Sequence, residues 1–216
     1  SGTILSTSPA AHVYKDASTK KREIDEMEVR IDEVTYTKED TQKLGIQNGD
    51  IVAIDPKVQI TESGFIKSRF LDDKISVSAL MGILHHLKEN AITPAYDLIF
   101  MMSTYEEVGH GMAHIPDEIA ELLAVDMGCI GLDLACTEQD VSICAKDSSG
   151  PYDYDLTSKL IELAKREAVS YAIDIYPQYG SDVSAARNAG NDIKGALIGP
   201  GVHASHGMER THIDGV

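Results

Sequence analysis

The sequence predicts an α/β fold of three layers, in which helices cover both faces of a mainly parallel sheet. The first observation is that short apolar runs alternate with segments of helical periodicity between residues 67 and 216. The second is that residues 1–66 lack this alternation and carry strand patterns separated by turns. The third is a hydrophobic content of 43%, which is enough for a buried core. We therefore expect a β-rich domain at 1–66 and a larger α/β domain at 67–216.

The β-rich segment contains few patterned elements and no cluster of catalytic residue types. Two strand patterns are expected here, at 28–32 and 51–56. A short helix is expected over 37–45, with N-cap, capping-box and C-cap residues at Thr37, Asp40 and Gly45. His12 is expected to be an ordinary loop residue. This segment is therefore not expected to carry chemistry.

The second segment alternates strands with helices, which is the pattern of a mainly parallel sheet. The expected strands are 98–102, 124–126, 140–146, 172–176 and 193–198. The expected helices are 72–90, 116–123, 154–168 and 184–188. The run at 98–102 is apolar throughout, which predicts a strand buried on both faces.

Two adjacent acids, Glu106 and Glu107, follow that apolar run directly. Open α/β sheets bind ligands at the carboxyl ends of their strands. Two neighbouring carboxylates there can divide the work of metal-assisted hydrolysis, because one holds a cation while the other takes a proton from water. A Glu pair is also common as a solvated surface feature. The functional reading is favoured because further acids and a histidine occupy similar element boundaries, namely Asp72, Asp73, Asp126, Asp182 and His206.

Two of these boundary acids have competing explanations. Asp72 opens a helix, so it is either an N-cap carboxylate worth about 1 kcal/mol or a ligand that bridges two cations. Asp126 ends a buried strand, where a carboxylate needs a partner, and a ligand role is favoured. With Glu107 and His206 they form a mixed oxygen and nitrogen set that Zn, Co or Mn accepts.

Charge and cysteine usage exclude several classes of partner. Lys and Arg number 19 against 35 Asp and Glu, and the net charge of −16 disfavours nucleic acid and anionic membranes. No apolar run is long enough to cross a membrane, and no signal peptide opens the sequence. The three cysteines are odd in number and lack metal-finger spacing. We expect reduced thiols in a cytoplasmic protein.

Five short motifs occur in the order seen in a known enzyme family. They are Leu71-Asp72-Asp73-Lys74, Glu106-Glu107-Val108-Gly109, Val125-Asp126-Met127-Gly128, Gly180-Ser181-Asp182 and His203-Ala204-Ser205-His206-Gly207-Met208-Glu209. The sequence thereby resembles the glutamyl/tetrahedral (TET)-type two-metal aminopeptidases over nearly its whole length. The resemblance implies a zinc-peptidase-like αβα catalytic domain at 67–216 and an inserted PDZ-like or barrel-like domain at 1–66 that serves assembly. It also implies peptide substrates and a homo-oligomer, from a dimer up to a dodecamer.

The resemblance also implies roles for individual residues. Two divalent metal ions, Zn or Co, are expected as cofactors. Asp72 is similar to the carboxylate that bridges both metals, Glu107 and His206 to ligands of one, and Asp126 to a ligand of the other. Glu106 is similar to the general base. Two further residues are expected near the substrate: Asp182 as an amine-binding or supporting residue, or alternatively an N-cap, and His203 as a carbonyl contact, or alternatively an exposed side chain.

The sequence departs from the family pattern in several ways. A His-x-Asp segment that supplies one more ligand is expected before the inserted domain, and a closing helix and strand are expected beyond Val216. Lys74 stands where Arg is usual, and Ser76 where Gly is usual. We therefore expect an incomplete domain that offers three ligands to one metal and two to the other, with low activity. The alternatives are an inactive homologue or fragment that acts only in assembly and a two-metal carboxypeptidase or deacylase, for which Arg187 and Arg210 are the nearest cations.

Overall fold

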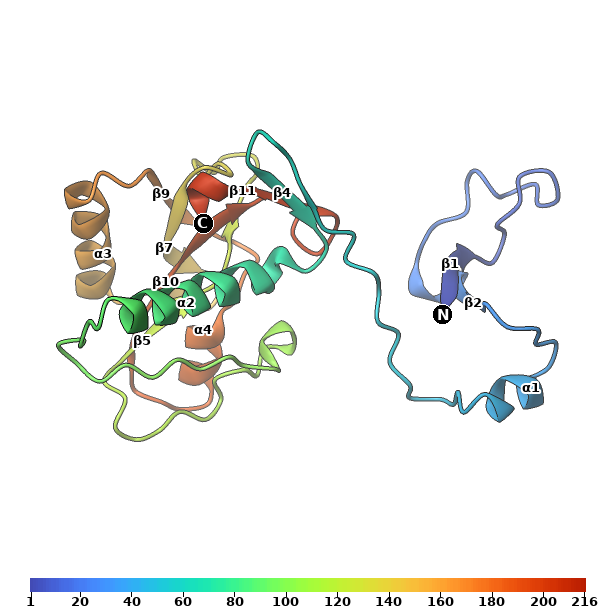
Figure 1. Cartoon of the computed structure of the whole chain (residues 1–216), viewed down its shortest axis with the longest axis horizontal. Coiled ribbons are helices and arrows are strands. Elements are labelled where there is room, and N and C mark those ends of the chain that lie inside the picture. The colour runs from blue at the N-terminus through green and yellow to red at the C-terminus, as the bar shows by residue number, and fades with distance from the viewer. The chain divides into compact units, whose positions relative to one another are not determined.

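A computed structural model describes all residues from 1 to 216. The chain forms two compact units, Ser1–Ile54 and Asp55–Val216, which are described separately (Figure 1). The boundary expected at residue 66 falls within strand β4, Phe65–Ser68, which belongs to the second unit. None of the helices combines the length and the hydrophobicity that crossing a bilayer requires.

The first unit is built on one antiparallel strand pair. Strand β1, Gly2–Ser6, pairs with β2, Met27–Ile31, which the 3-10 turn η1, Ile24–Glu26, precedes. Helix α1, Lys38–Lys43, has the expected capping box, because Asp40 N donates to Thr37 Oγ1 at 3.2 Å and Thr37 N donates to Asp40 Oδ2 at 3.2 Å. The strand expected at 51–56 is wrong, since these residues pair with no other strand and Ile51 is 94% exposed. This unit contains no buried hydrophobic side chain.

The second unit contains a six-stranded mixed sheet in the order β5-β10-β7-β8, with β6 beside β10 and β9 beside β7. Its strands are β5, Glu121–Val125; β6, Gly128–Cys129; β7, Val141–Asp147; β8, Gly150–Pro151; β9, Tyr171–Ile175; and β10, Lys194–Val202. The expectation of a mainly parallel sheet is confirmed, because β10 runs parallel to β5 and β6 and β7 runs parallel to β9, although β7 is antiparallel to β10 and to the short strand β8. The alternation of strands and helices along the sequence predicts a parallel pair only where one helix connects two strands that lie side by side. Strands β7 and β9, which α3 connects, are such a pair.

Three helices pack on this sheet: α2, Leu71–Glu89; α3, Tyr154–Arg166; and α4, Asp182–Asn188. Helix α4 buries Val183 in a cluster with Ala124 of β5 and Leu197 of β10. Helix α2 contributes Leu71 and Ile75 to a different cluster. Because both helices contact β5 and β10, the core of the unit is centred on these two strands.

A smaller three-stranded sheet lies at the start of α2. Its order is β11-β4-β3, with β3 at Gln59–Ile60 and β11 at Glu209–His212, and the 3-10 turn η3, Ile213–Gly215, follows it. In this sheet Glu209 is directly opposite Ser68, which is three residues before α2 begins. The pairing therefore brings the loop before β11 close to the first turn of α2.

Two expected elements of the second unit are wrong. Residues 98–102 form no strand, and Leu98 and Ile99 are 55% and 50% exposed, because no neighbouring strand accepts their backbone hydrogen bonds. Residues 116–119 form a turn in place of a helix, and Leu122 and Leu123 lie in β5. There the pairing of β5 with β10 overrides local helical preference. The other strands and helices expected in this unit are confirmed to within a few residues.

Candidate metal centre

Four separate elements bring acids and a histidine together. Asp72 lies in the first turn of α2, Asp126 directly follows β5, Glu107 lies in the 3-10 turn η2 at Glu106–Val108, and His206 lies before β11. The Nε2 atom of His206 is 3.2 Å from Asp72 Oδ2 and 3.5 Å from Glu107 Oε2. Ligand atoms of these three residues all lie within 4.8 Å of one another, so they could hold one cation.

A second group shares Asp72 with the first. It consists of Asp72, Asp73 and Asp126, whose carboxylate oxygens also lie within 4.8 Å of one another. This group is buried, since Asp126 is 6% exposed and the side chain of Asp72 is 10% exposed. The first group is more open, with side-chain exposures of 71% for His206 and 54% for Glu107. The structure thus places a buried all-oxygen group beside an accessible oxygen and nitrogen group.

The clustered carboxylates repel one another in a partly dehydrated site. Burial, followed by the charges of Asp126 and Glu107, raises the pKa of Asp72 to about 7. Burial, followed by the charge of Asp126, raises the pKa of Asp73 to about 9. Burial also raises the pKa of Asp126 to about 6, against the opposing hydrogen bond from Tyr179. No lysine or arginine forms an ion pair with these carboxylates, and the imidazole of His206 is the basic group that approaches Asp72.

The residues present fit divalent cations. The donors are carboxylates and one imidazole, which are ordinary ligands of zinc and cobalt. Asp73 Oδ1 is buried and has no hydrogen-bond partner, which is costly for a carboxylate unless a cation or proton satisfies it. Two groups that share Asp72 would hold two cations next to each other.

Glu106 lies beside these groups but belongs to neither of them. Burial, followed by the charges of Asp126 and Asp182, raises the pKa of Glu106 to about 8. Glu106 directly precedes Glu107 in η2, and it is a ligand in neither group. That is the position required of a group that exchanges protons with water at the site.

Asp182 is directed toward the same region. It is the first residue of α4, and Ser181 occupies the N-cap, so an N-cap role does not explain Asp182. Its Oδ2 accepts a hydrogen bond from Ser103 Oγ at 2.8 Å, and its Oδ1 is buried without a partner. Gly111 allows this close approach, because a Cβ there would lie 2.1 Å from Asp182 Oδ1. Burial raises the pKa of Asp182, against the hydrogen bonds from Ser103 and from the backbone N–H of Met112.

The remaining histidines and arginines lie outside the two groups. His203 is exposed, and its backbone pairs with Arg210. His12, His85 and His86 are exposed. The guanidinium of Arg210 forms an ion pair with Glu138 at 2.9 Å.

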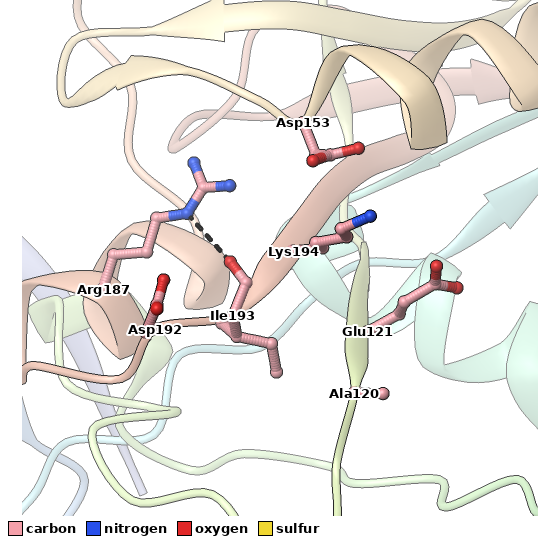
Figure 2. A pocket seen from close by; sticks show the side chains of 7 residues that line it. All are labelled: Ala120, Glu121, Asp153, Arg187, Asp192, Ile193 and Lys194. Atoms are coloured by element: carbon pink, nitrogen blue, oxygen red, sulfur yellow. Dashed lines mark hydrogen bonds between the residues drawn. The ribbon is translucent and has the colours of Figure 1, made fainter.

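Arg187 lines a surface hollow of about 640 Å³ at the other end of the sheet (Figure 2). The hollow is bounded by Ala120 and Glu121 at the amino end of β5, by Ile193 and Lys194 at the amino end of β10, and by the side chains of Asp153, Arg187 and Asp192. The two ligand groups lie beyond the carboxyl end of β5. Arg187 is therefore poorly placed to hold the carboxylate of a substrate bound at those groups.

Three residues that support the cluster have no assigned role in the sequence reading, namely Ser76, Tyr179 and Glu209. Asp73 stands there among the boundary acids but is not assigned to a metal. Tyr179 donates a hydrogen bond from its hydroxyl to Met127 O at 3.1 Å and lies against Asp126. The position of Asp73 next to Asp72 is visible in the sequence, whereas the contacts of Tyr179 depend on tertiary structure alone.

Comparisons with known proteins identify the family of this chain. The family model of the M42 glutamyl aminopeptidases matches residues 1–216. The chain belongs to this M42 family. It is 51% identical over 212 residues to "Putative aminopeptidase YhfE" of Bacillus subtilis (strain 168), a match that covers 98% of this chain and 61% of that protein.

Solved structures share the fold of this M42 chain. The TET aminopeptidase of the marine sediment archaeon Thaumarchaeota archaeon SCGC AB-539-E09 matches with a TM-score of 0.78 and 19% identity, over 99% of this chain and 63% of that one. The TET1 peptidase of Pyrococcus horikoshii matches with a TM-score of 0.73 and 22% identity, over 86% of this chain and 56% of that one. The expected α/β zinc-peptidase-like fold is thus confirmed. The chain spans about three fifths of the length of these relatives.

Proposed function

We propose that this chain carries the metal-binding and catalytic residues of an aminopeptidase that removes N-terminal residues from peptides. The observation that supports this most strongly is the pair of ligand groups sharing Asp72, with the carboxylate of Glu106 beside them and outside both. Membership of the M42 family supports the reaction class. The carboxypeptidase or deacylase alternative is weakened, because Arg187 lines a hollow at the other end of the sheet and Arg210 pairs with Glu138.

Two divalent cations, zinc or cobalt, are the proposed cofactors. Asp72, Glu107 and His206 would hold one, and Asp72 with Asp126 would hold the other. Asp73 adds a third carboxylate to the second group, for which the sequence predicts only two ligands. When bound, such cations lower the pKa of water and polarise a peptide carbonyl.

Glu106 is the proposed general base. Its carboxylate would accept a proton from the attacking water and then donate that proton to the nitrogen of the leaving peptide. A carboxyl whose pKa is raised by burial holds the proton long enough to return it. The negative charge of Asp182 would attract the ammonium group of the substrate, which would fix the scissile bond one residue from the N-terminus. His203 remains a proposed contact for the substrate carbonyl.

Assembly is the proposed role of the first unit. A unit of 54 residues with no buried hydrophobic side chain gains little stability from its own core. Contact with a second copy would cover its exposed apolar residues, so we propose a homo-oligomer, from a dimer up to a dodecamer. The Pyrococcus horikoshii TET1 structure is described as a tetrahedron or a large octahedral shell. The three cysteines are unpaired, in keeping with a cytoplasmic location.

The test is metal content per chain after dialysis, together with hydrolysis of a panel of aminoacyl amides and N-blocked peptides with and without added zinc or cobalt. Two cations per chain and hydrolysis only of substrates with a free amine are expected. Glu106→Gln should retain both cations and lose roughly 100-fold or more in kcat. Glu118→Gln, at an exposed glutamate outside the cluster, is the matched control. Bound metal without turnover in the wild-type chain would favour the inactive homologue or fragment.

A further inference from the structure

Glu209 is a buried acid outside both ligand groups. It is the first residue of β11 and is 1% exposed. No lysine, arginine or histidine forms an ion pair with it. A buried carboxylate is costly unless hydrogen bonds satisfy its oxygens.

Both oxygens of Glu209 are satisfied by the backbone of candidate metal ligands. Oε2 accepts a hydrogen bond from the backbone N–H of Asp72 at 2.9 Å, although Asp72 lies 137 residues away in the chain. Oε1 accepts a hydrogen bond from the backbone N–H of His206 at 2.8 Å. The carboxylate of Glu209 therefore links the backbone of Asp72, in α2, to the backbone of His206, in the loop before β11.

The backbone N–H groups of Asp72 and His206 both need an acceptor such as the Glu209 carboxylate. Asp72 lies in the first turn of α2, where backbone N–H groups have no partner within the helix. His206 has φ of +63°, and Ala204 in the same loop has φ of +61°. The left-handed region costs a residue with a side chain roughly 1–2 kcal/mol, so this loop needs contacts that hold it. The bond from Glu209 to His206 is one such contact.

We propose that Glu209 is a positioning residue that sets the separation of Asp72 and His206 for a divalent cation. Hydrogen bonds from two backbone N–H groups to one rigidly held carboxylate fix both backbones, and hence the distance of 3.2 Å between His206 Nε2 and Asp72 Oδ2. This inference rests on the metal binding in the proposed function but not on the identity of the reaction.

The carboxylate is required because both of its oxygens accept. In Glu209→Gln one oxygen becomes an NH2 group, which cannot accept and faces a backbone N–H. The variant should keep the size of the side chain while releasing either Asp72 or His206. Substitutions of residues that orient metal ligands typically weaken metal affinity by about 10–100-fold.

The chain offers a matched control in Asp174. This residue is 6% exposed, and its two oxygens accept hydrogen bonds from the backbone N–H groups of Ala135 and Cys136 at 2.8 and 3.0 Å. Asp174→Asn therefore makes the same chemical change in a buried acid. That acid also binds two backbone N–H groups, but neither belongs to a residue of the two ligand groups.

The experiment measures cobalt binding to the wild-type chain and to the two variants by calorimetry and by the visible absorption of bound Co²⁺. Glu209→Gln should bind cobalt about 10–100-fold more weakly with an altered spectrum, whereas Asp174→Asn should keep wild-type affinity. Thermal unfolding without metal compares the folding defects of the two variants. If Glu209→Gln does not fold, Glu209→Asp replaces it, and weaker binding is again expected.

Cobalt affinity of the glutamate variant within about threefold of wild type would overturn the positioning role, as would a wild-type chain that binds no cobalt. An equal loss of affinity in Asp174→Asn would also overturn it, because the effect would then be one of general stability. A wild-type chain that binds cobalt in the expected way but hydrolyses no aminoacyl amide would leave the positioning role standing and remove the proposed function.

Discussion

The hydroxyl of Ser76 donates a hydrogen bond of 2.7 Å to the backbone carbonyl oxygen of Asp126. Ser76 is fully buried and lies in α2, whereas Asp126 directly follows β5. The bond therefore ties the helix that carries Asp72 and Asp73 to the strand end that carries the third member of the buried group. A glycine, which is the residue expected at this position from the family resemblance, could not make this bond.

Ser76→Ala should destabilise the second unit by about 1–2 kcal/mol, because it leaves the carbonyl of Asp126 without this donor. Urea unfolding of the metal-free chain measures the change. Ser78→Ala is the matched control, since Ser78 lies in the same helix, is exposed and donates to Lys74 O at 2.9 Å. Similar effects of the two substitutions would show that the bond between Ser76 and Asp126 has no special importance.

Local signals made part of this structure predictable from sequence. The capping box of Thr37 and Asp40 acts over three residues, and the helical spacing of apolar residues in α3 reports one buried face. The candidate ligands Asp72, Glu107, Asp126 and His206 were predictable because they occur in motifs. The structure brings all four to one region, as the two groups show.

Features that depend on pairing partners were not predictable. The apolar run at 98–102 has the composition of a buried strand, but a strand also needs a neighbour, and sequence does not say whether one is present. The antiparallel direction of β10 relative to β7 was not predictable either, because the sequence does not say which strands lie next to each other. Glu209 stands in the motif of His206, yet its bond to Asp72 spans 137 residues and leaves no local pattern.

Asp182→Asn should raise KM for substrates with a free N-terminal amine more than it lowers kcat. The substitution removes the negative charge that would attract an ammonium group while keeping an acceptor for Ser103. Steady-state kinetics on aminoacyl amides measures both constants, with Asp192→Asn at an exposed position as control. A fall in kcat at constant KM would instead assign Asp182 to support of Glu106.

The stability of the metal-free chain should decrease as pH rises from about 5 to about 8. The pKa values of Asp72, Glu106 and Asp126 are raised from 3.8 or 4.5 to about 7, about 8 and about 6, so in this range the folded chain binds more protons than the unfolded chain. Stability falls with pH wherever the folded state binds more protons. Thermal unfolding with a chelator present measures this, and a midpoint that rises toward pH 8 would contradict it.

Added zinc should reverse this trend, because metal binding requires deprotonated ligands. The rise in unfolding temperature on adding zinc should be larger at pH 8 than at pH 5. A chain whose zinc-induced shift is the same at both pH values would show that zinc binds away from the clustered carboxylates.

Asp73→Asn should weaken the second of two bound cations and leave the first nearly unchanged. Asp73 contributes an oxygen only to the buried group, whereas Glu107 and His206 hold the open group together with Asp72. Nitrogen donors favour zinc and cobalt, so the open group should fill first, and an all-oxygen group should bind more weakly. Titration with cobalt, followed by calorimetry, should therefore show two steps in the wild type and a weaker second step in the variant.

His206→Ala is the complementary variant, because it should weaken the first step and leave the all-oxygen group intact. Loss of both steps in Asp73→Asn would mean that the two groups cannot fill separately. That behaviour is expected if Asp72, which both groups share, binds the two cations only together. Two unchanged steps would show that Asp73 is not a ligand, and its buried Oδ1 would then be satisfied by a proton, in keeping with a pKa raised to about 9.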